Sequence, residues 1–539
     1  MGRICGPVFR LSGDSRGVPL IDDAFNMTVA VAYPARWHAA VLELRADPKR
    51  NAVEARRLLG RLHEALMGRP TFALAERLAA SERWRPERLA ELQSAKLRRL
   101  VEHAARHCPF YRDRGLPSGG SSITLDDLAA VNLLTRDDLR RRGRRMCWQH
   151  MPGKRLADFT RGTTEERLAY FWDRRRQAWD KANRLRGHAW HGFTPDDREL
   201  HVWPVDPPRT PQAALRQWLR AGRDHLLGEL QIDSLHAFKD RLALTWRAWR
   251  RFDPSRVTAY PSVLAQLIRD GRRAGCRLGN PALRKVFLTG EVTFPWQRRL
   301  IETELGVPTV QMYGVQEAGA LSFACEFESW HVAAESAIIE IIRDGRAASP
   351  GELGEVVVTG LESRAMPLIR YCTGDVVRVP GRVSPGGGLS SVQGLPTSGG
   401  GGGHSQLSLI GSGPCPCGRG LPVMPKVVGR AGDFLENSDG RWVEPAVVVA
   451  SLGEVLQDGT FQVRQDACGD VQVLVVPTSG QRHGWSAAAR DRVRELAGPA
   501  FRCLTREVSI LHRSLFGKCR YVSSERTRRG LAWPAGPTM

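Results

Sequence analysis

The stretch that decides the fold is KVFLTG (285–290), followed by PWQRRLIETELG (295–306) and PTVQMYG (308–314). The first and third are short apolar runs typical of buried strands, and the second has the length and the final glycine of a helix. A strand, a helix and another strand in this order predict an α/β domain with a largely parallel sheet. Ligands of such sheets bind beyond the carboxyl ends of the strands, so the loops after Gly290 and Tyr313 are the first candidates for a site.

The rest of the chain predicts a large domain followed by a smaller one. Residues 38–105 have helical periodicity, and ESAIIEIIRD (335–344) and ELGEVVVTG (352–360) are expected to be antiparallel strands. In the C-terminal part we expect strands at WVEPAVVVAS (442–451), FQVRQ (461–465) and DVQVLVV (470–476), and a helix at AAARDRVRELA (487–497). The expected fold is α/β: a large domain with mixed, partly parallel sheets and helices, and a small α+β lid domain.

We place the large domain at 38–428 and the lid domain at 429–525. Residues 1–37 are expected to be poorly ordered, and residues 526–539 form a tail. Residues 381–413 contain GGGLSSVQGLPTSGGGGGHS, a composition that cannot bury enough apolar surface to order itself, so we interpret them as a flexible insert.

Composition excludes several classes of function. The formal charge is +22, but only eight of the 79 basic residues are Lys, and the Arg residues are scattered along the whole chain. We therefore expect no nucleic acid as the main partner. No apolar run is long enough for a membrane span or a signal peptide, so we expect a cytoplasmic protein. Eleven Cys, an odd number in a large chain, argue against a disulfide framework. Composition leaves the oligomeric state open.

Five short motifs occur in a fixed order, and a sixth, Gly290-Glu291, follows the first strand. In chain order the five are Thr160-Arg161-Gly162-Thr163-Thr164-Glu165, Tyr313-Gly314-Val315-Gln316-Glu317, Arg370-Tyr371-Cys372-Thr373-Gly374-Asp375, Gly429-Arg430-Ala431-Gly432-Asp433 and Gly517-Lys518. Each is weak alone. In this order, over roughly residues 90–525, the chain resembles the adenylate-forming enzymes, in particular their phenylacetate–CoA ligase-like and CapK-like branch.

The resemblance implies a nucleotide site. Thr160, Gly162, Thr163 and Thr164 would cradle the ATP phosphates, a task that suits backbone N–H groups and hydroxyls. Further cofactor-binding residues implied by the family motifs are Gly290, Glu291, Tyr313, Gly314, Asp375 and Arg430. In the family the acid at Asp375 accepts hydrogen bonds from the ribose hydroxyls, and the Arg at the domain hinge approaches the nucleotide.

Two residues are candidates for catalysis by the same resemblance. Glu317 would help to hold Mg²⁺ on the phosphates, because Mg²⁺ prefers carboxylate and phosphate oxygens. Lys518 would swing over the site and offset charge at the α-phosphate. The implied reaction activates a carboxylic acid with ATP to an acyl-AMP and then transfers the acyl group to CoA. The expected cofactors are ATP and Mg²⁺, with CoA as the acceptor.

Three motif positions depart from the family pattern: Glu165, Cys372 and Gly432. They keep two alternatives open. The chain could transfer a nucleotide to a hydroxyl of a cofactor or sugar, or it could be a non-catalytic relative in polysaccharide or capsule biosynthesis.

Four further residues have the composition of a structural zinc site. Cys325 and His331 follow the Tyr-Gly-x-x-Glu motif, and Cys415 and Cys417 come after the Gly-rich insert. Three Cys and one His are a common ligand set for structural Zn²⁺. The spacing also allows four unrelated side chains.

Overall fold

The computed structural model describes residues 48–114, 116, 123–160, 168–205, 207–234, 242–276, 279–381, 415–478, 484–514 and 517–527. Our expectations for residues 1–37, for Gly162, Thr163, Thr164 and Glu165, for 382–413 and for 528–539 lie outside these residues. The chain divides into two compact units, 1–53 and 54–539. Of the first unit the structure describes only residues 48–53, which begin helix α2 (Pro48–Leu66).

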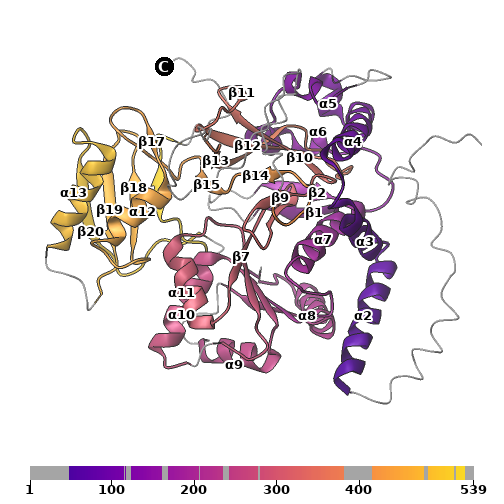
Figure 1. The fold of residues 1–539 in the computed structure, drawn as a ribbon, viewed down its shortest axis with the longest axis horizontal. Helices are drawn as coiled ribbons and strands as arrows, with labels where there is room; N and C mark the ends of the chain where they lie inside the picture. Colours follow the sequence, from indigo (N-terminus) through magenta and orange to yellow (C-terminus); the bar gives the residue numbers. More distant parts are fainter. Residues whose placement is uncertain are drawn as a thin grey trace, which may run out of the picture. The chain divides into compact units, whose positions relative to one another are not determined.

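The second unit contains an eight-stranded mixed sheet in the order β14-β9-β8-β7-β6-β5-β3-β4 (Figure 1). Its strands are β3 (Glu199–Trp203), β4 (Glu229–Asp233), β5 (Arg256–Ala259), β6 (Lys285–Leu288), β7 (Thr309–Val315), β8 (Gly319–Ala324), β9 (Trp330–Val332) and β14 (Val423–Met424). Strands β3 to β7 are parallel, and the remaining pairs are antiparallel. The helices between and before these strands are α7 (Arg174–Ala189), α8 (Pro211–Leu226), α9 (Leu242–Phe252), α10 (Pro261–Arg273) and α11 (Pro295–Leu305).

The β6-α11-β7 unit confirms the strand, helix and strand predicted at 285–314. Pro295 occupies the first turn of α11, where a missing N–H costs nothing. Gly306 ends the helix with a φ of 68°, a left-handed conformation that favours glycine. Ile301 and Leu305 are buried one turn apart and hold the helix against the sheet.

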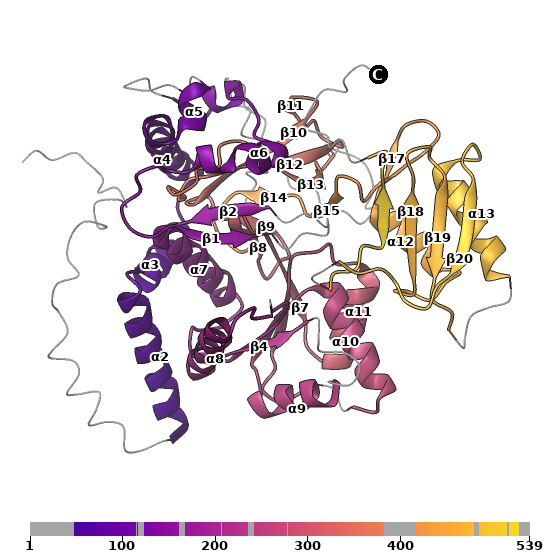
Figure 2. The same cartoon turned by 180° about the vertical axis from the view of Figure 1, so that it is seen from behind.

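A second, five-stranded sheet is antiparallel throughout, in the order β11-β10-β12-β13-β15 (Figure 2). Its strands are β10 (Ala337–Arg343), β11 (Arg346–Ala347), β12 (Leu353–Gly360), β13 (Tyr371–Arg378) and β15 (Val427–Arg430). The strands expected at 335–344 and 352–360 are thus confirmed. The N-terminal part adds the helices α3 (Thr71–Ser81), α4 (Pro86–His107), α5 (Pro109–Asp113), η2 (Asp127–Ala130) and α6 (Arg136–Met146), and the hairpin of β1 (Leu156–Phe159) and β2 (Ala169–Trp172).

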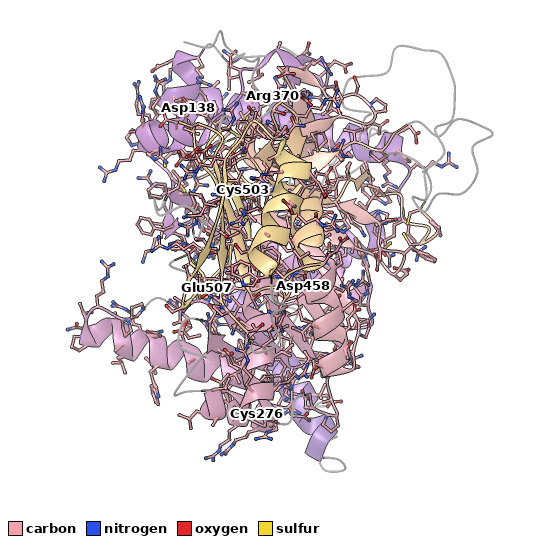
Figure 3. All side chains as sticks on the ribbon, turned by 90° about the vertical axis from the view of Figure 1, so that its left-hand side faces the viewer. Asp138, Cys276, Arg370, Asp458, Cys503 and Glu507 are labelled. Atoms are coloured by element: carbon pink, nitrogen blue, oxygen red, sulfur yellow. The ribbon has the colours of Figure 1, made fainter. Side chains whose placement is uncertain are left out.

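The C-terminal segment forms a four-stranded sheet in the order β20-β19-β18-β21. The elements from 435 onward are β16 (Leu435–Glu436), β17 (Trp442–Val443), α12 (Pro445–Gly453), β18 (Phe461–Gln465), β19 (Val471–Val475), α13 (Trp485–Ala497), β20 (Cys503–Glu507) and β21 (Val522–Ser524). Figure 3 labels Cys503 and Glu507 at the two ends of β20. Of the helices described, none is both long and apolar enough to cross a membrane.

The strand expected at 442–451 was wrong beyond Val443. The structure has a helix there, α12, which begins at Pro445. Val448, Val449 and Leu452 are buried at helical spacing and pack into the core of the C-terminal segment. The preference of valine for strands is weak, and packing of this apolar face overrides it.

His188 lies in a buried polar cluster at the amino-terminal end of the parallel strands. Its ring is 3% exposed and packs 4.4 Å from the ring of Phe287, and its Nδ1 lies 3.9 Å from a carboxylate oxygen of Glu199. Burial lowers the pKa of His188 to about 3, despite the opposing charge of Glu199. The folded protein therefore holds this ring neutral at pH values where the unfolded chain protonates it.

We expect the free energy of unfolding to fall as the pH drops below about 6.5, by up to about 1.4 kcal/mol per pH unit from this group, until about pH 3. The sign follows because the unfolded chain binds the proton first. Urea titrations between pH 7 and pH 5 should show a shallower fall for His188→Phe. The exposed His150→Phe is the control and should keep the slope of the wild-type protein. Identical slopes for all three proteins would contradict the prediction.

Candidate active site

Lys518 reaches the carboxyl ends of the parallel strands from the C-terminal segment. Its Nζ donates a 2.7 Å hydrogen bond to the carbonyl oxygen of Gly290, two residues beyond β6. The same atom lies 4.3 Å from the ring centre of Tyr260, which follows β5. Gly290 has a φ of 76°, and a Cβ there would lie 2.5 Å from the Tyr260 ring. Only glycine at position 290 therefore lets the backbone lie so close to the Tyr260 ring and the Lys518 ammonium group.

Asp375 lies on β13, directly opposite Arg430 of β15. Its Oδ2 accepts a 2.9 Å hydrogen bond from the hydroxyl of Tyr313, and its Oδ1 lies 3.1 Å from Nε of Arg430. Burial raises the pKa of Asp375, and the charge of Arg430 opposes that rise. A carboxylate has about four acceptor positions, so these two donors leave it capacity for further hydrogen bonds.

Glu317 is anchored by a second tyrosine, Tyr371, which lies on the same strand as Asp375. The hydroxyl of Tyr371 donates a 2.7 Å hydrogen bond to Oε1 of Glu317. Burial, followed by the nearby Glu317 charge, raises the pKa of Tyr371 well above its usual value, so the hydroxyl stays a donor. The main chain of β7 bends near this contact. A Cβ on Gly314 would lie 2.5 Å from the carbonyl oxygen of Gly319 on β8, so a side chain would not fit there.

Lys518 and Asp375 each contact a residue at the carboxyl end of one of two neighbouring strands, β6 and β7. Leu288 of β6 pairs with Gln311 of β7 in parallel. Gly290 lies two residues beyond Leu288, just past the end of β6, and Tyr313 lies two residues beyond Gln311 within β7. Gly290 contacts Lys518 and Tyr313 contacts Asp375. Through these contacts the cation of the C-terminal segment and the buried carboxylate of β13 each reach a residue at the carboxyl end of one of the neighbouring strands β6 and β7.

The expected phosphate loop connects β1 to β2, and of its four expected binding residues the structure describes Thr160. The Thr160 side chain accepts hydrogen bonds from the backbone N–H of Leu168, at 3.0 Å, and from Nη2 of Arg136, at 3.2 Å. Arg136 begins α6, and the residue two before it, Leu134, bridges to Tyr371 of β13. Sequence reasoning missed Arg136, because no local pattern links it to Thr160.

Two of the three departures from the family pattern lie in described parts. Cys372 packs with Leu133, Ile342 and Val357, on the face of β13 opposite its neighbour Tyr371. The change at 372 therefore leaves the face that carries Asp375 intact. At the third departure, Gly432 has a φ of 90°.

The acid next to Gly432 holds the turn after β15. Asp433 accepts a 2.9 Å hydrogen bond from the backbone N–H of Arg430 and pairs at 2.5 Å with Nε of Arg520. An acid is thus present one position away from the place where the family pattern has it. It ties the chain near Asp375 to the segment that carries Lys518.

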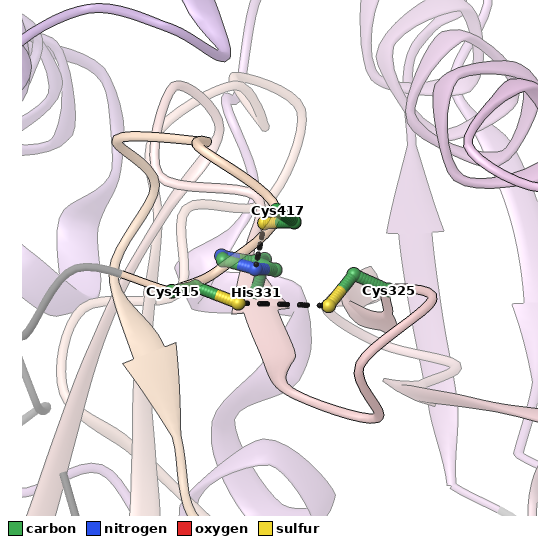
Figure 4. A group of neighbouring side chains, drawn as sticks. All are labelled: Cys325, His331, Cys415 and Cys417. Atoms are coloured by element: carbon green, nitrogen blue, oxygen red, sulfur yellow. Dashed lines mark hydrogen bonds between the residues drawn. The ribbon is translucent and has the colours of Figure 1, made fainter.

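The four candidate metal ligands converge. One ligand atom from each of Cys325, His331, Cys415 and Cys417 lies within 4.8 Å of the others (Figure 4). The sulfur atoms of Cys325 and Cys415 are 3.7 Å apart, and the sulfur of Cys417 is 3.2 Å from Nε2 of His331. Two thiolates on a tetrahedral zinc, each about 2.3 Å from the metal, would be separated by about 3.8 Å.

The orientation of His331 also suits a metal ligand. Its Nδ1 lies 3.0 Å from the carbonyl oxygen of Leu421, which can only accept, so Nδ1 carries the proton. Nε2 then faces the cysteines with its lone pair. Pairing of β14 with β9 places Val423 opposite His331 and so brings the Cys415–Cys417 turn to the ring.

Comparisons with known proteins find similar sequences over part of the chain and a similar fold over most of it. No family model matches the chain. The phenylacetate–coenzyme A ligase of Pseudomonas putida is 31% identical over 147 residues, which cover 25% of this chain and 33% of that enzyme. The enzyme of the same name from Thermus thermophilus is 29% identical over 134 residues, 23% of this chain and 29% of that enzyme. The chain thus spans about a third of the length of the curated relatives it matches.

Solved structures extend the likeness to most of the fold. A 2-hydroxyisobutyryl-CoA ligase, solved in the postadenylation state in complex with R3-HIB-AMP, covers 83% of this chain with a TM-score of 0.61 and 17% identity. The match covers 92% of that structure. Over these segments the chain is similar to phenylacetate–coenzyme A ligases, and over most of its length it shares the fold of the 2-hydroxyisobutyryl-CoA ligase.

Proposed function

We propose that this chain activates a carboxylic acid with ATP to an acyl-AMP and passes the acyl group to CoA. The observation that supports the proposal most is that Lys518 contacts Gly290, just beyond β6, while Asp375 accepts a hydrogen bond from Tyr313 of the neighbouring strand β7. A compact cation suits the charge that develops at a reacting α-phosphate, and a buried carboxylate suits the hydroxyls of a nucleotide. The printed names of the relatives point to the same chemistry.

Each residue has a defined task in this proposal. Asp375 accepts hydrogen bonds from the ribose hydroxyls, since a carboxylate is an acceptor only. Thr160 begins the loop that binds the phosphates. Glu317, with one oxygen held by Tyr371, would hold Mg²⁺ through its carboxylate, and the ion would offset phosphate charge.

In this proposal the adenylation step is accelerated because the reacting groups are held in place and the developing charge is stabilised. A carboxylate oxygen of the substrate attacks the α-phosphorus, the bond to pyrophosphate breaks, and Lys518 offsets charge on the transferring group. The turn at 430–433 is the proposed hinge, with the large domain at 38–428 and the lid at 429–525. Rotation about it removes Lys518 and admits the CoA thiol, which displaces AMP from the acyl carbon.

The test is carboxylate-dependent exchange between ATP and labelled pyrophosphate, with a panel of aryl and aliphatic acids that includes phenylacetate. We expect at least one acid to support exchange and then to form a thioester on addition of CoA. Exchange that requires a hydroxyl compound in place of an acid would establish nucleotidyl transfer to an alcohol. Absence of ATP binding by calorimetry would overturn the proposal and favour the non-catalytic alternative.

We also propose a cytoplasmic location, where ATP and CoA are available, and a small-molecule partner rather than nucleic acid. The scattered arginines support the second point. Many of them form ion pairs in the structure, for example Arg256 with Glu199 and Arg370 with Glu340, and so serve packing rather than a continuous basic surface.

The cluster of Cys325, His331, Cys415 and Cys417 is proposed as a structural zinc site. Three thiolates and one neutral imidazole, closely spaced and mostly buried, form a closed tetrahedral set with no position for substrate. The metal would tie the turn before β14 to the turn after β8.

Metal analysis of protein purified without chelator should find about one zinc ion per chain, as expected for a closed structural site. Cys415→Ser should lose most of the metal and melt at a lower temperature, because metal binding contributes to folding. Cys468→Ser, at an exposed cysteine outside the cluster, is the matched control and should keep the metal. Less than about half a zinc ion per wild-type chain would contradict the site.

A further inference from the structure

Several hydrogen bonds hold the loop that carries Lys518 against helix α10 and against the residue just beyond β6. Besides the bond from Lys518 to Gly290, the backbone N–H of Cys519 donates a 3.1 Å hydrogen bond to Oγ of Ser262. Nη2 of Arg513 lies 3.4 Å from Oε1 of Gln266, one turn further along α10. The contact at Ser262 fixes the backbone directly next to the ammonium-bearing residue.

Ser262 is held in one orientation by Glu291. The serine is 1% exposed and lies in the first turn of α10. Its backbone N–H donates to Glu291 Oε2 at 3.0 Å, and its Oγ lies 2.9 Å from Oε1. A hydroxyl has one hydrogen and two lone pairs, and a carboxylate only accepts. The hydrogen of Ser262 therefore goes to Glu291, which leaves a lone pair for the N–H of Cys519.

We propose that Ser262 is the positioning residue that seats the 517–520 loop, and with it Lys518, for the adenylation half-reaction. This inference rests on the proposed function. Ser262 acts on the backbone at Cys519, not on the substrate, so it is not a catalytic residue. The seat is needed only while Lys518 is at the strand edge. When the lid rotates for thioester formation, the bond to Cys519 is released.

Hydrogen–deuterium exchange of the full chain tests the seat without any substrate. In Ser262→Ala the amide of Cys519 loses its acceptor, whereas the bond from residue 262 N–H to Glu291 remains. We expect the peptide that contains Cys519 to exchange about fivefold to tenfold faster, the effect of one net hydrogen bond on local opening. Unchanged exchange of this peptide would overturn the proposal.

A matched control lies before the same strand. Ser255 precedes β5, whereas Ser262 follows it. Oγ of Ser255 lies 3.1 Å from both Oδ1 of Asp197 and the carbonyl oxygen of Arg198, and its single hydrogen can point to either acceptor. Ser255→Ala removes a comparable hydroxyl at the opposite end of β5. We expect this variant to leave exchange at Cys519 as in the wild-type protein.

Half-reaction kinetics separate positioning from a merely structural role. With phenylacetate or the acid that the panel identifies, Ser262→Ala should lower the kcat of ATP–pyrophosphate exchange about tenfold. Thioester formation from the synthetic acyl-AMP and CoA should be unchanged, and Ser262→Thr, which keeps the hydroxyl, should restore exchange. Equal losses in both half-reactions would overturn the positioning role.

The two tests distinguish failure of this inference from failure of the proposed function. If no acid supports exchange in the wild-type protein, the proposed function fails, and the deuterium measurement still decides whether Ser262 seats the loop. If the wild-type protein is active and the Ser262→Ala peptide exchanges at the wild-type rate, only the inference about Ser262 fails.

Discussion

Lys518→Ala should lower carboxylate-dependent ATP–pyrophosphate exchange by about a hundredfold or more, the usual loss when a positioned electrostatic group is removed from a transition state. In the structure the ammonium group already lies at the strand edge, with its Nζ 2.7 Å from the carbonyl of Gly290. It is 9% exposed, so its charge is screened less than that of a surface lysine. Alanine leaves the transferring phosphoryl group without this cation.

The effect should be confined to the first half-reaction. Thioester formation from synthetic acyl-AMP and CoA should stay within about twofold of the wild-type rate, because the proposed rotation removes Lys518 before that step. Lys426→Ala is the control, since Lys426 is a half-exposed lysine that pairs with Glu328 away from the strand edge. Unchanged exchange in Lys518→Ala, in protein that melts at the wild-type temperature, would refute the catalytic role.

Asp375→Asn should weaken ATP binding by about tenfold to a hundredfold. Hydrogen bonds to a charged acceptor are worth about 1.5–3 kcal/mol each, and an amide keeps only one acceptor oxygen. In the wild-type protein the two carboxylate oxygens are fixed by Tyr313 and Arg430. The amide also leaves Arg430 without its counter-charge, which adds to the loss.

Titration calorimetry with ATP and with 2′-deoxy-ATP makes this test specific for the ribose. The wild-type protein should bind the deoxy nucleotide more weakly, and Asp375→Asn should bind both with nearly the same affinity, as a double-mutant cycle requires of two interacting groups. Asp439→Asn, at an exposed turn of the lid, is the control. If the variant still discriminates between the two nucleotides as the wild-type protein does, Asp375 does not hold the ribose.

Local patterns predicted several elements because the physical causes are local. The strand at 285–288 and the helix that ends at Gly306 follow from apolar runs and from the φ that glycine allows at the end of a helix. The same reasoning failed at 442–451. There the valines fit a strand by propensity, but the structure buries Val448, Val449 and Leu452 on one side of a helix. Packing against residues that are distant in the chain selected the helix, although the local sequence also allowed a strand.

In the metal-ligand cluster, the sequence indicated which residues could bind a metal, but only the fold showed that they lie together. The four residues could be named from their chemistry, although about 90 positions separate Cys325 from Cys415. Their approach to within 4.8 Å depends on the pairing of β14 with β9, which no local pattern encodes. The Arg136–Thr160 contact and the Tyr371–Glu317 bond are of the same kind, since each joins elements that lie far apart in the chain.

By itself the sequence determined the fold class, the order of the motifs and the residue types suited to bind a nucleotide and a metal. The fold class depends on periodicity over short stretches, whereas the nucleotide-binding residues follow from the resemblance of the motifs to a known family. Only the tertiary structure decided that Lys518 contacts Gly290 and that Asp375 contacts Tyr313. It also decided that Cys372 packs on the other face of β13 and that Ser262 holds the backbone next to Lys518. Register between strands and contact between the C-terminal segment and the middle of the chain are set by burial and hydrogen bonding across the whole fold, and no short stretch of residues contains that information.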